Sequence, residues 1–273
     1  MRRAVLTYAL IFCAVFAGAQ TADELVAKNL AAKGGIEKIK AIKSFRMKAQ
    51  LQEGGFKAQV GEDAAAPNKL RQTVTIQGMS QIEAYDGSTG WQISPFEGRK
   101  DPELLGDDEM RSLVEDADFY GPLVDYQAKG NRIEYLGHDM VDGDDALRLK
   151  VTLKNGDIFD YYLDPDTYLE IRIDRQHFIR GSVREVEEDM GSYKQVAGVY
   201  FPFSMESGPK RNPNARTKIN IESMEANVAL DDAEFKMPAA PATAAPQQHQ
   251  EPPVKQKAAP KPPEPAKPPK DSF

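Results

Sequence analysis

The chain has 273 residues, of which 41% are hydrophobic, so it can bury a core and wholesale disorder is excluded. Its formal net charge of -7 argues against general nucleic-acid binding, which needs clustered Lys and Arg. Three His and one Cys leave little material for a Cys/His metal site or a thiol enzyme, and we expect neither metal nor cofactor. Beyond the N-terminus no apolar run reaches the ~18 residues of a membrane-spanning helix, so we expect no transmembrane span in the mature chain.

Residues 1–19 have the features of an export signal. Arg2 and Arg3 form a positive start, an apolar run follows, and residues 17–19 (AGA) form a small-residue cleavage site. We therefore expect cleavage before Gln20 and a periplasmic location in a Gram-negative-type envelope. Cleavage would also remove the only cysteine, so the mature protein would be stabilised without a disulfide.

The C-terminal residues 238–273 differ in composition from the rest of the chain. They hold 11 of the 19 prolines, mixed with Ala, Lys and Gln. Such a segment cannot bury enough apolar surface to fold, and we expect an extended, disordered tail. It is either a solvated end without a role or a spacer that docks to a partner.

The folded part is therefore expected over 20–237, and it opens with a helical pattern. Thr21 and Glu24 fit the T-x-x-E capping box, and Gly34-Gly35 end the pattern. A second, short helical turn follows from Ile36.

After these helices the hydrophobic period falls to two, which indicates a sheet with one apolar face. The alternation is clearest over 45–51, 147–153, 169–174 and 219–221. Asn155-Gly156 between two such runs is a strong hairpin signal. We expect ten or eleven strands joined mainly by hairpins, in a large antiparallel sheet that curls. The predicted class is mainly β (α+β).

Residues 101–127 interrupt the strand pattern. Asp107 or Asp108 can cap a helix that carries Leu113 and Ala117, and aromatic residues follow. We expect this apolar segment to cover the concave face of the curled sheet. The alternative is an ordinary helix packed into a filled core.

Catalytic patterns are not found in the sequence. It has no H-E-x-x-H, G-x-S-x-G, Walker or G-x-G-x-x-G pattern. His138, Asp139 and Asp142 are of types that could form an acid/base or metal cluster, but residues of these types are common in exposed turns. We expect no enzymatic activity.

Trp91 is the only tryptophan, and it follows a turn at Asp86-Gly87. A lone Trp on a strand is usually a core residue. It could equally line a pocket for an apolar ligand.

Two stretches resemble the LolA-like outer-membrane lipoprotein-sorting family. Residues 67–71 (PNKLR) and 84–96 (AYDGSTGWQISPF) match its order of Pro-Asn, Asp-Gly, Trp and Pro, and 161–170 and 198–204 also look like that family. The motif matches are Pro67, Asp86, Gly87 and Trp91. One position departs from the lipoprotein carriers, because Ala66 stands where they have a basic residue.

The resemblance implies an incomplete β-barrel, closed on one side by helices, whose cavity holds acyl chains of a lipoprotein or lipid in transit to the outer membrane. Membrane proteins would then act as donor and acceptor. From the alternation we predict the residues that line the cavity, with Leu113 on the cover: Met47, Leu51, Leu70, Val74, Trp91, Leu113, Leu149, Val151, Ile171 and Phe203. The alternative function is a non-enzymatic envelope module with a filled interior that acts through protein partners.

Overall fold

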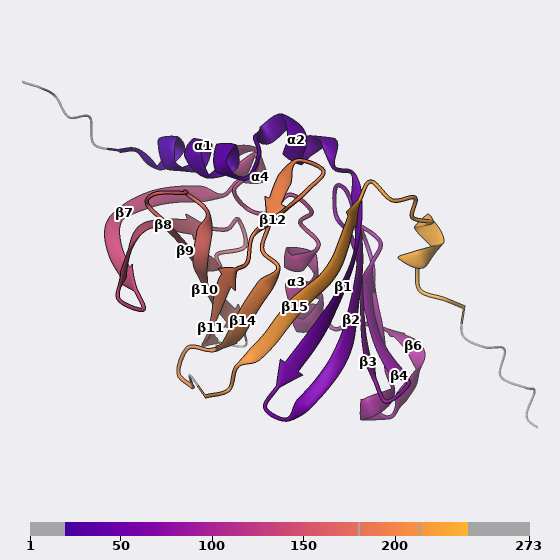
Figure 1. Ribbon diagram of the computed structural model, residues 1–273. Helices are drawn as coiled ribbons and strands as arrows, with labels where there is room; N and C mark the ends of the chain where they lie inside the picture. Colours follow the sequence, from indigo (N-terminus) through magenta and orange to yellow (C-terminus); the bar gives the residue numbers. More distant parts are fainter. Residues whose placement is uncertain (1–19, 180, 213, 240–273) are drawn as a thin grey trace, which may run out of the picture. The chain divides into compact units, whose positions relative to one another are not determined.

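The computed structural model describes residues 20–179, 181–212 and 214–239, which form four α-helices and 15 strands (Figure 1). The helices are α1 (Ala22–Ala32), α2 (Ile36–Ala41), α3 (Asp107–Asp116) and α4 (Tyr126–Lys129). The strands are β1 (Ser44–Glu53), β2 (Phe56–Ala65), β3 (Lys69–Ile76), β4 (Met79–Tyr85), β5 (Gly90–Ser94), β6 (Arg99–Leu104), β7 (Arg132–Val141), β8 (Asp144–Thr152), β9 (Ile158–Leu163), β10 (Glu170–Ile179), β11 (Ser182–Gly191), β12 (Lys194–Val196), β13 (Val199–Phe201), β14 (Ser204–Pro209) and β15 (Thr217–Ala226).

Thirteen of these strands form one antiparallel sheet in the order β6-β5-β4-β3-β2-β1-β15-β14-β11-β10-β9-β8-β7. Two hairpin meanders, β1–β6 and β7–β11, are joined through β14 and β15. The edge strands β6 and β7 do not pair with each other, so the sheet is unclosed. The predicted mainly-β class with an incomplete barrel is confirmed.

The expected number of strands was too low. Strand β6 lies partly in the region expected to interrupt the sheet, because its residues are largely exposed and therefore need no apolar alternation. Pro102 is tolerated there because β6 is an edge strand. The separate hairpin β12–β13 has only three residues in each strand, too few to show a period.

The helical N-terminus forms as its sequence predicts. The Thr21 side chain accepts from the Glu24 N–H at 3.2 Å, and Glu24 accepts from the Thr21 N–H at 3.0 Å. Leu25 and Val26 of α1 pack on β8 and β9 in the largest hydrophobic cluster. We call the sheet face that α1 and α3 cover the inner face, and the opposite face the outer face.

The segment between the two edge strands, 105–131, crosses the inner face (Figure 1). Its helix α3 is capped by Gly106, one residue before the expected Asp107 or Asp108. Glu109 accepts from the Gly106 N–H at 3.1 Å, which closes the first turn without a capping side chain. Leu113 and Ala117 pack against Leu70 and Tyr85 of the first meander. The expected cover over the inner face is confirmed.

Most of the predicted signal peptide and tail cannot be compared with the structure. Residues 1–19, with Cys13, and 240–273 lie outside the described residues. Among the described helices, none combines the length and apolar character needed to cross a bilayer.

Candidate functional site

A cavity of about 280 Å³ lies on the inner face, beneath α2 and the covering segment. Its apolar wall comes from α1, α2, β1, the covering segment, β9–β11 and the β12–β13 hairpin. The apolar and aromatic lining residues include Leu30, Ile39, Ile42, Phe45, Phe119, Tyr120, Leu123, Val124, Tyr161, Ile173, Met190, Val199 and Phe201. Such a lining favours an apolar ligand of modest size.

Polar groups meet at one wall of this cavity. Lys33 Nζ lies 3.0 Å from Glu170 Oε1, and the Tyr193 hydroxyl donates to the Glu170 main-chain oxygen at 2.8 Å. Burial by itself raises the pKa of the Glu170 carboxyl, but the charge and hydrogen bond of Lys33, with further hydrogen bonds to the carboxylate, hold the net pKa below its ordinary value. The cavity therefore offers a fixed, charged group beside its apolar wall, as ligand sites commonly do.

The ten residues predicted to line a cavity are all described, and none of them lines this one. Leu149 and Val151 are fully buried in the cluster beneath α1, and Leu70 packs against Leu113 of α3. Met47 and Phe203 share a third cluster. Leu51 and Val74 are partly buried on the same inner face. The alternation identified the inner face for the seven of these residues other than Leu113, which lies on the covering helix α3. The chain's own helices cover much of that face.

Trp91 lies on the outer face. It pairs with Ala84, which pairs with Arg71, whereas Leu70 of the inner face pairs with Tyr85. The Trp91 indole N–H donates to the Phe235 carbonyl oxygen at 2.8 Å, and both side chains are at most 2% exposed. The core interpretation of Trp91 is therefore correct, and its placement in a cavity wall was wrong.

Ile171 also lies away from the cavity. A β-bulge separates Glu170, which pairs with Leu163, from Arg172, which pairs with Tyr162. The extra residue in the bulge turns Glu170 to the inner face and lets Ile171 pack beside Tyr162 on the outer face. Simple alternation through residues 169–174 could not reveal this change of side.

Three of the four family-motif residues, Pro67, Asp86 and Gly87, lie in turns, and Pro67 contacts the covering segment. The Asp86 carboxylate accepts from the N–H groups of Ser88 and Thr89 at 2.9 and 2.8 Å and closes the β4–β5 turn. Gly87 has φ of +99°, and a Cβ there would lie 3.2 Å from the Asn68 side chain. The Pro67 carbonyl accepts from the Phe119 N–H at 3.3 Å, which ties the covering segment to this loop.

A polar cluster joins α3 to the second meander. Arg111 donates to both carboxylate oxygens of Asp157, at 2.9 and 2.5 Å. One turn further along α3, Glu115 Oε2 lies 3.6 Å from His177 Nδ1. Burial raises the pKa of Glu115 to about 8, although Arg175 opposes the shift. Sequence reasoning missed this cluster, because its members come from three separate segments and no motif links them.

A second, open groove of about 540 Å³ runs along α3. Its walls include Arg111, Val114, Glu115 and Asn155. Asp118 and Pro122 line both this groove and the inner cavity, so the covering segment separates the two spaces.

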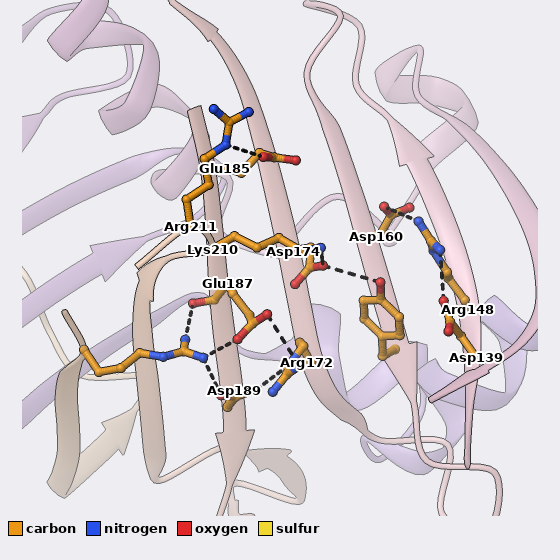
Figure 2. Close-up of polar contacts among 12 residues, drawn as sticks. Asp139, Arg148, Asp160, Arg172, Asp174, Glu185, Glu187, Asp189, Lys210 and Arg211 are labelled. Atoms are coloured by element: carbon orange, nitrogen blue, oxygen red, sulfur yellow. Dashed lines mark hydrogen bonds and ion pairs between the residues drawn. The ribbon is translucent and has the colours of Figure 1, made fainter. Parts of the chain in front are cut away.

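The outer face of the second meander is occupied by ion pairs (Figure 2). Arg148 bridges Asp139 and Asp160 at 2.9 Å each, and Lys210, just after β14, pairs with Asp174 of β10. A further group on β10, β11 and the β14–β15 connection comprises Arg172, Glu185, Glu187, Asp189, Arg211 and Arg216. This face is unsuited to an apolar ligand, which leaves the inner face as the candidate site.

Comparison with solved structures supports the same fold. A LolA superfamily protein from Nitrosomonas europaea aligns with a TM-score of 0.55 at 11% identity, over 80% of this chain and 98% of its own. A domain assigned to outer membrane lipoprotein sorting in Vibrio parahaemolyticus aligns with a TM-score of 0.54 at 11% identity, over 78% of this chain and 94% of its own.

A DUF1329 family protein from Desulfovibrio piger has a TM-score of 0.54 at 14% identity, over 79% of this chain and 97% of its own. The chain has a LolA-like fold. No protein-family profile matches the sequence, and no curated protein matches it significantly. The likeness at these identities establishes the fold alone.

Proposed function

We propose that this protein is a periplasmic carrier that binds one acyl chain, of a lipid or a lipoprotein, in the inner cavity and helps deliver it toward the outer membrane. The observation that carries the proposal is the apolar cavity beneath α2 and the covering segment. Its volume of about 280 Å³ lies at the lower end for ligand pockets, which favours one slender chain over several. The LolA-like fold, shared with a lipoprotein-sorting domain, supports the same conclusion.

The proposed carrier needs no catalysis. Each methylene that leaves water for an apolar wall gains about 0.8 kcal/mol, so a preformed cavity can hold a chain without forming a bond. Release then requires a better acceptor or a displacement of the cover. The covering segment is held by contacts that can break reversibly, including the exposed ion pair between Lys40 of α2 and Asp125 of the segment at 2.8 Å.

Mass spectrometry of lipid extracted from the purified protein, together with uptake of a fluorescent fatty acid, tests this function. Leu30→Trp adds bulk at the cavity wall and should lower fatty-acid affinity at least tenfold. Leu136→Trp is the matched control, because Leu136 is 48% exposed on the edge strand β7. Absence of bound lipid together with absence of uptake would overturn the proposal.

The second candidate is a non-enzymatic envelope module with a filled interior that acts through protein partners. The packing of Leu113 and Ala117 against Leu70 favours it, since this part of the inner face is already filled. The uptake assay with Leu30→Trp distinguishes the two candidate functions. A filled module would show no fatty-acid uptake in either the native chain or the variant.

A further inference from the structure

Three potential metal ligands lie together where α3 meets β9 and β10. His177 Nδ1 lies 3.6 Å from Glu115 Oε2 and 3.6 Å from Asp157 Oδ2, and one donor atom from each residue lies within 4.8 Å of the others. These separations are too long for good hydrogen bonds. Tetrahedral ligands at ~2.1 Å from one ion stand ~3.4 Å apart, so the spacing suits a shared cation.

Glu115 points to a missing partner in this cluster. Its side chain is 9% exposed, and none of the described residues forms a hydrogen bond with its Oε2 atom. Buried polar atoms are nearly always paired, because an unpaired one loses its hydration without compensation. The unpaired oxygen faces the imidazole of His177, so a cation between them would satisfy it.

The side chains around the cluster do not balance one another's charge. When all four carboxyl groups around the cluster are ionised, they outnumber the two guanidinium groups by two. The carboxylates are Glu115, Asp116, Asp157 and Glu188, and the guanidinium groups are Arg111 and Arg175. One divalent cation would balance this excess.

We propose that Glu115, Asp157 and His177 bind a divalent transition-metal ion of the zinc class, which fastens α3 to β9 and β10. One imidazole and two carboxylates suit zinc, whereas magnesium and calcium prefer all-oxygen sites. Donors fix the orientation of Asp157: the Phe178 N–H donates to Oδ1 at 3.0 Å, while Arg111 Nε and Asn155 Nδ2 donate to Oδ2 at 2.9 and 3.0 Å. Metal binding through Oδ2 would therefore displace one of these two donors. The proposal is independent of lipid binding.

The open groove along α3 supplies an entry path. Glu115, Arg111 and Asn155 line this groove, so an ion can reach the site from solvent. The groove also leaves room for a water molecule or another ligand in the fourth position of a tetrahedral site.

Isothermal titration with ZnCl₂, on purified chain stripped with EDTA, tests the site. We expect one tight Zn²⁺ per chain, a higher thermal midpoint with Zn²⁺ than with Mg²⁺, and tetrahedral d–d absorption when Co²⁺ replaces Zn²⁺. His177→Gln and Glu115→Gln should each weaken Zn²⁺ binding at least tenfold. His138→Gln is the control, because His138 is exposed on β7 and pairs with Asp145.

His249→Gln is a second control, since it removes the remaining histidine of the chain. The proposal is overturned if the native chain shows no heat of Zn²⁺ binding and no shift of its thermal midpoint specific to Zn²⁺, regardless of the results for the variants. Tight binding that survives both His177→Gln and Glu115→Gln, or that is lost in His138→Gln or His249→Gln, would overturn it as well.

Discussion

Phe235 provides a direct test of how the C-terminal segment is held to the outer face. The residue is 1% exposed and follows the 3₁₀ turn Asp232–Glu234, which is tied to the first meander by the Lys69–Asp232 pair at 2.7 Å. The Glu234 carbonyl accepts from Arg71 at 3.1 Å, so the main chain is fixed on both sides. Phe235→Ala removes a fully buried ring from a site that cannot easily collapse, and we expect a loss of about 3–5 kcal/mol of unfolding free energy.

Urea unfolding followed by tryptophan fluorescence and by far-UV circular dichroism measures this loss. Trp91 is the only tryptophan, and its indole bonds to the Phe235 carbonyl, so fluorescence reports on this segment. The carbonyl belongs to the main chain and persists in the variant, so the measured change isolates the side chain. Met237→Ala, at a position 40% exposed, is the matched control and should cost less than about 0.5 kcal/mol. A cost below about 1 kcal/mol for Phe235→Ala would refute this account of the packing.

Three further perturbations have expected outcomes. Burial raises the pKa of Glu62 from its ordinary 4.5 to about 7, so the native chain loses stability as pH rises from 4.5 to 7, and the loss levels off above 7. Glu62→Gln should therefore gain about 2–3 kcal/mol relative to the native chain between pH 5 and 8.5 in urea unfolding, most of it by pH 7. A difference that stays constant with pH would contradict this. Gly34→Ala would place a Cβ against a backbone carbonyl of the β12–β13 hairpin, whereas the Cβ of Gly35→Ala meets open space. Calorimetry should therefore show a lower thermal midpoint for Gly34→Ala than for Gly35→Ala. Equal midpoints would contradict the clash. Lys33→Met leaves the buried Glu170 carboxylate without its cation and should lower the unfolding free energy by about 1–3 kcal/mol in urea. Lys48→Met, on the exposed side of β1, is the control and should change the unfolding free energy very little. Equal losses would argue against the Lys33–Glu170 pair.

Local patterns predicted the elements well where neighbouring residues decide the structure. The capping box at Thr21 and Glu24 depends on residues three apart, and the Asn155-Gly156 turn depends on its own backbone preferences. The side-chain period of two likewise identified the inner face through Leu149 and Leu70.

Long-range packing decided what local patterns could not predict. Trp91 lies on the outer face and is covered by a segment more than a hundred residues away, so no nearby alternation reveals that cover. The bulge at Glu170 adds one residue to a strand without any glycine to mark it. The candidate site depends on such features, because the bulge turns Glu170 toward the cavity and places it beside Lys33.

The two sides of α3 differ in chemistry, and this difference indicates how the cover would move. Toward the first meander, α3 buries Leu113 and Ala117, and separating them from Leu70 would expose apolar surface at about 25 cal/mol per Å². Toward the second meander it presents Arg111, paired with Asp157, and separating this pair would let water solvate both charges. Desolvation nearly offsets the attraction within a buried pair, so the ionic side is the weaker attachment. We therefore expect α3 to stay with β3 and β4 and to separate first from β9 and β10, where a bound cation would oppose the opening.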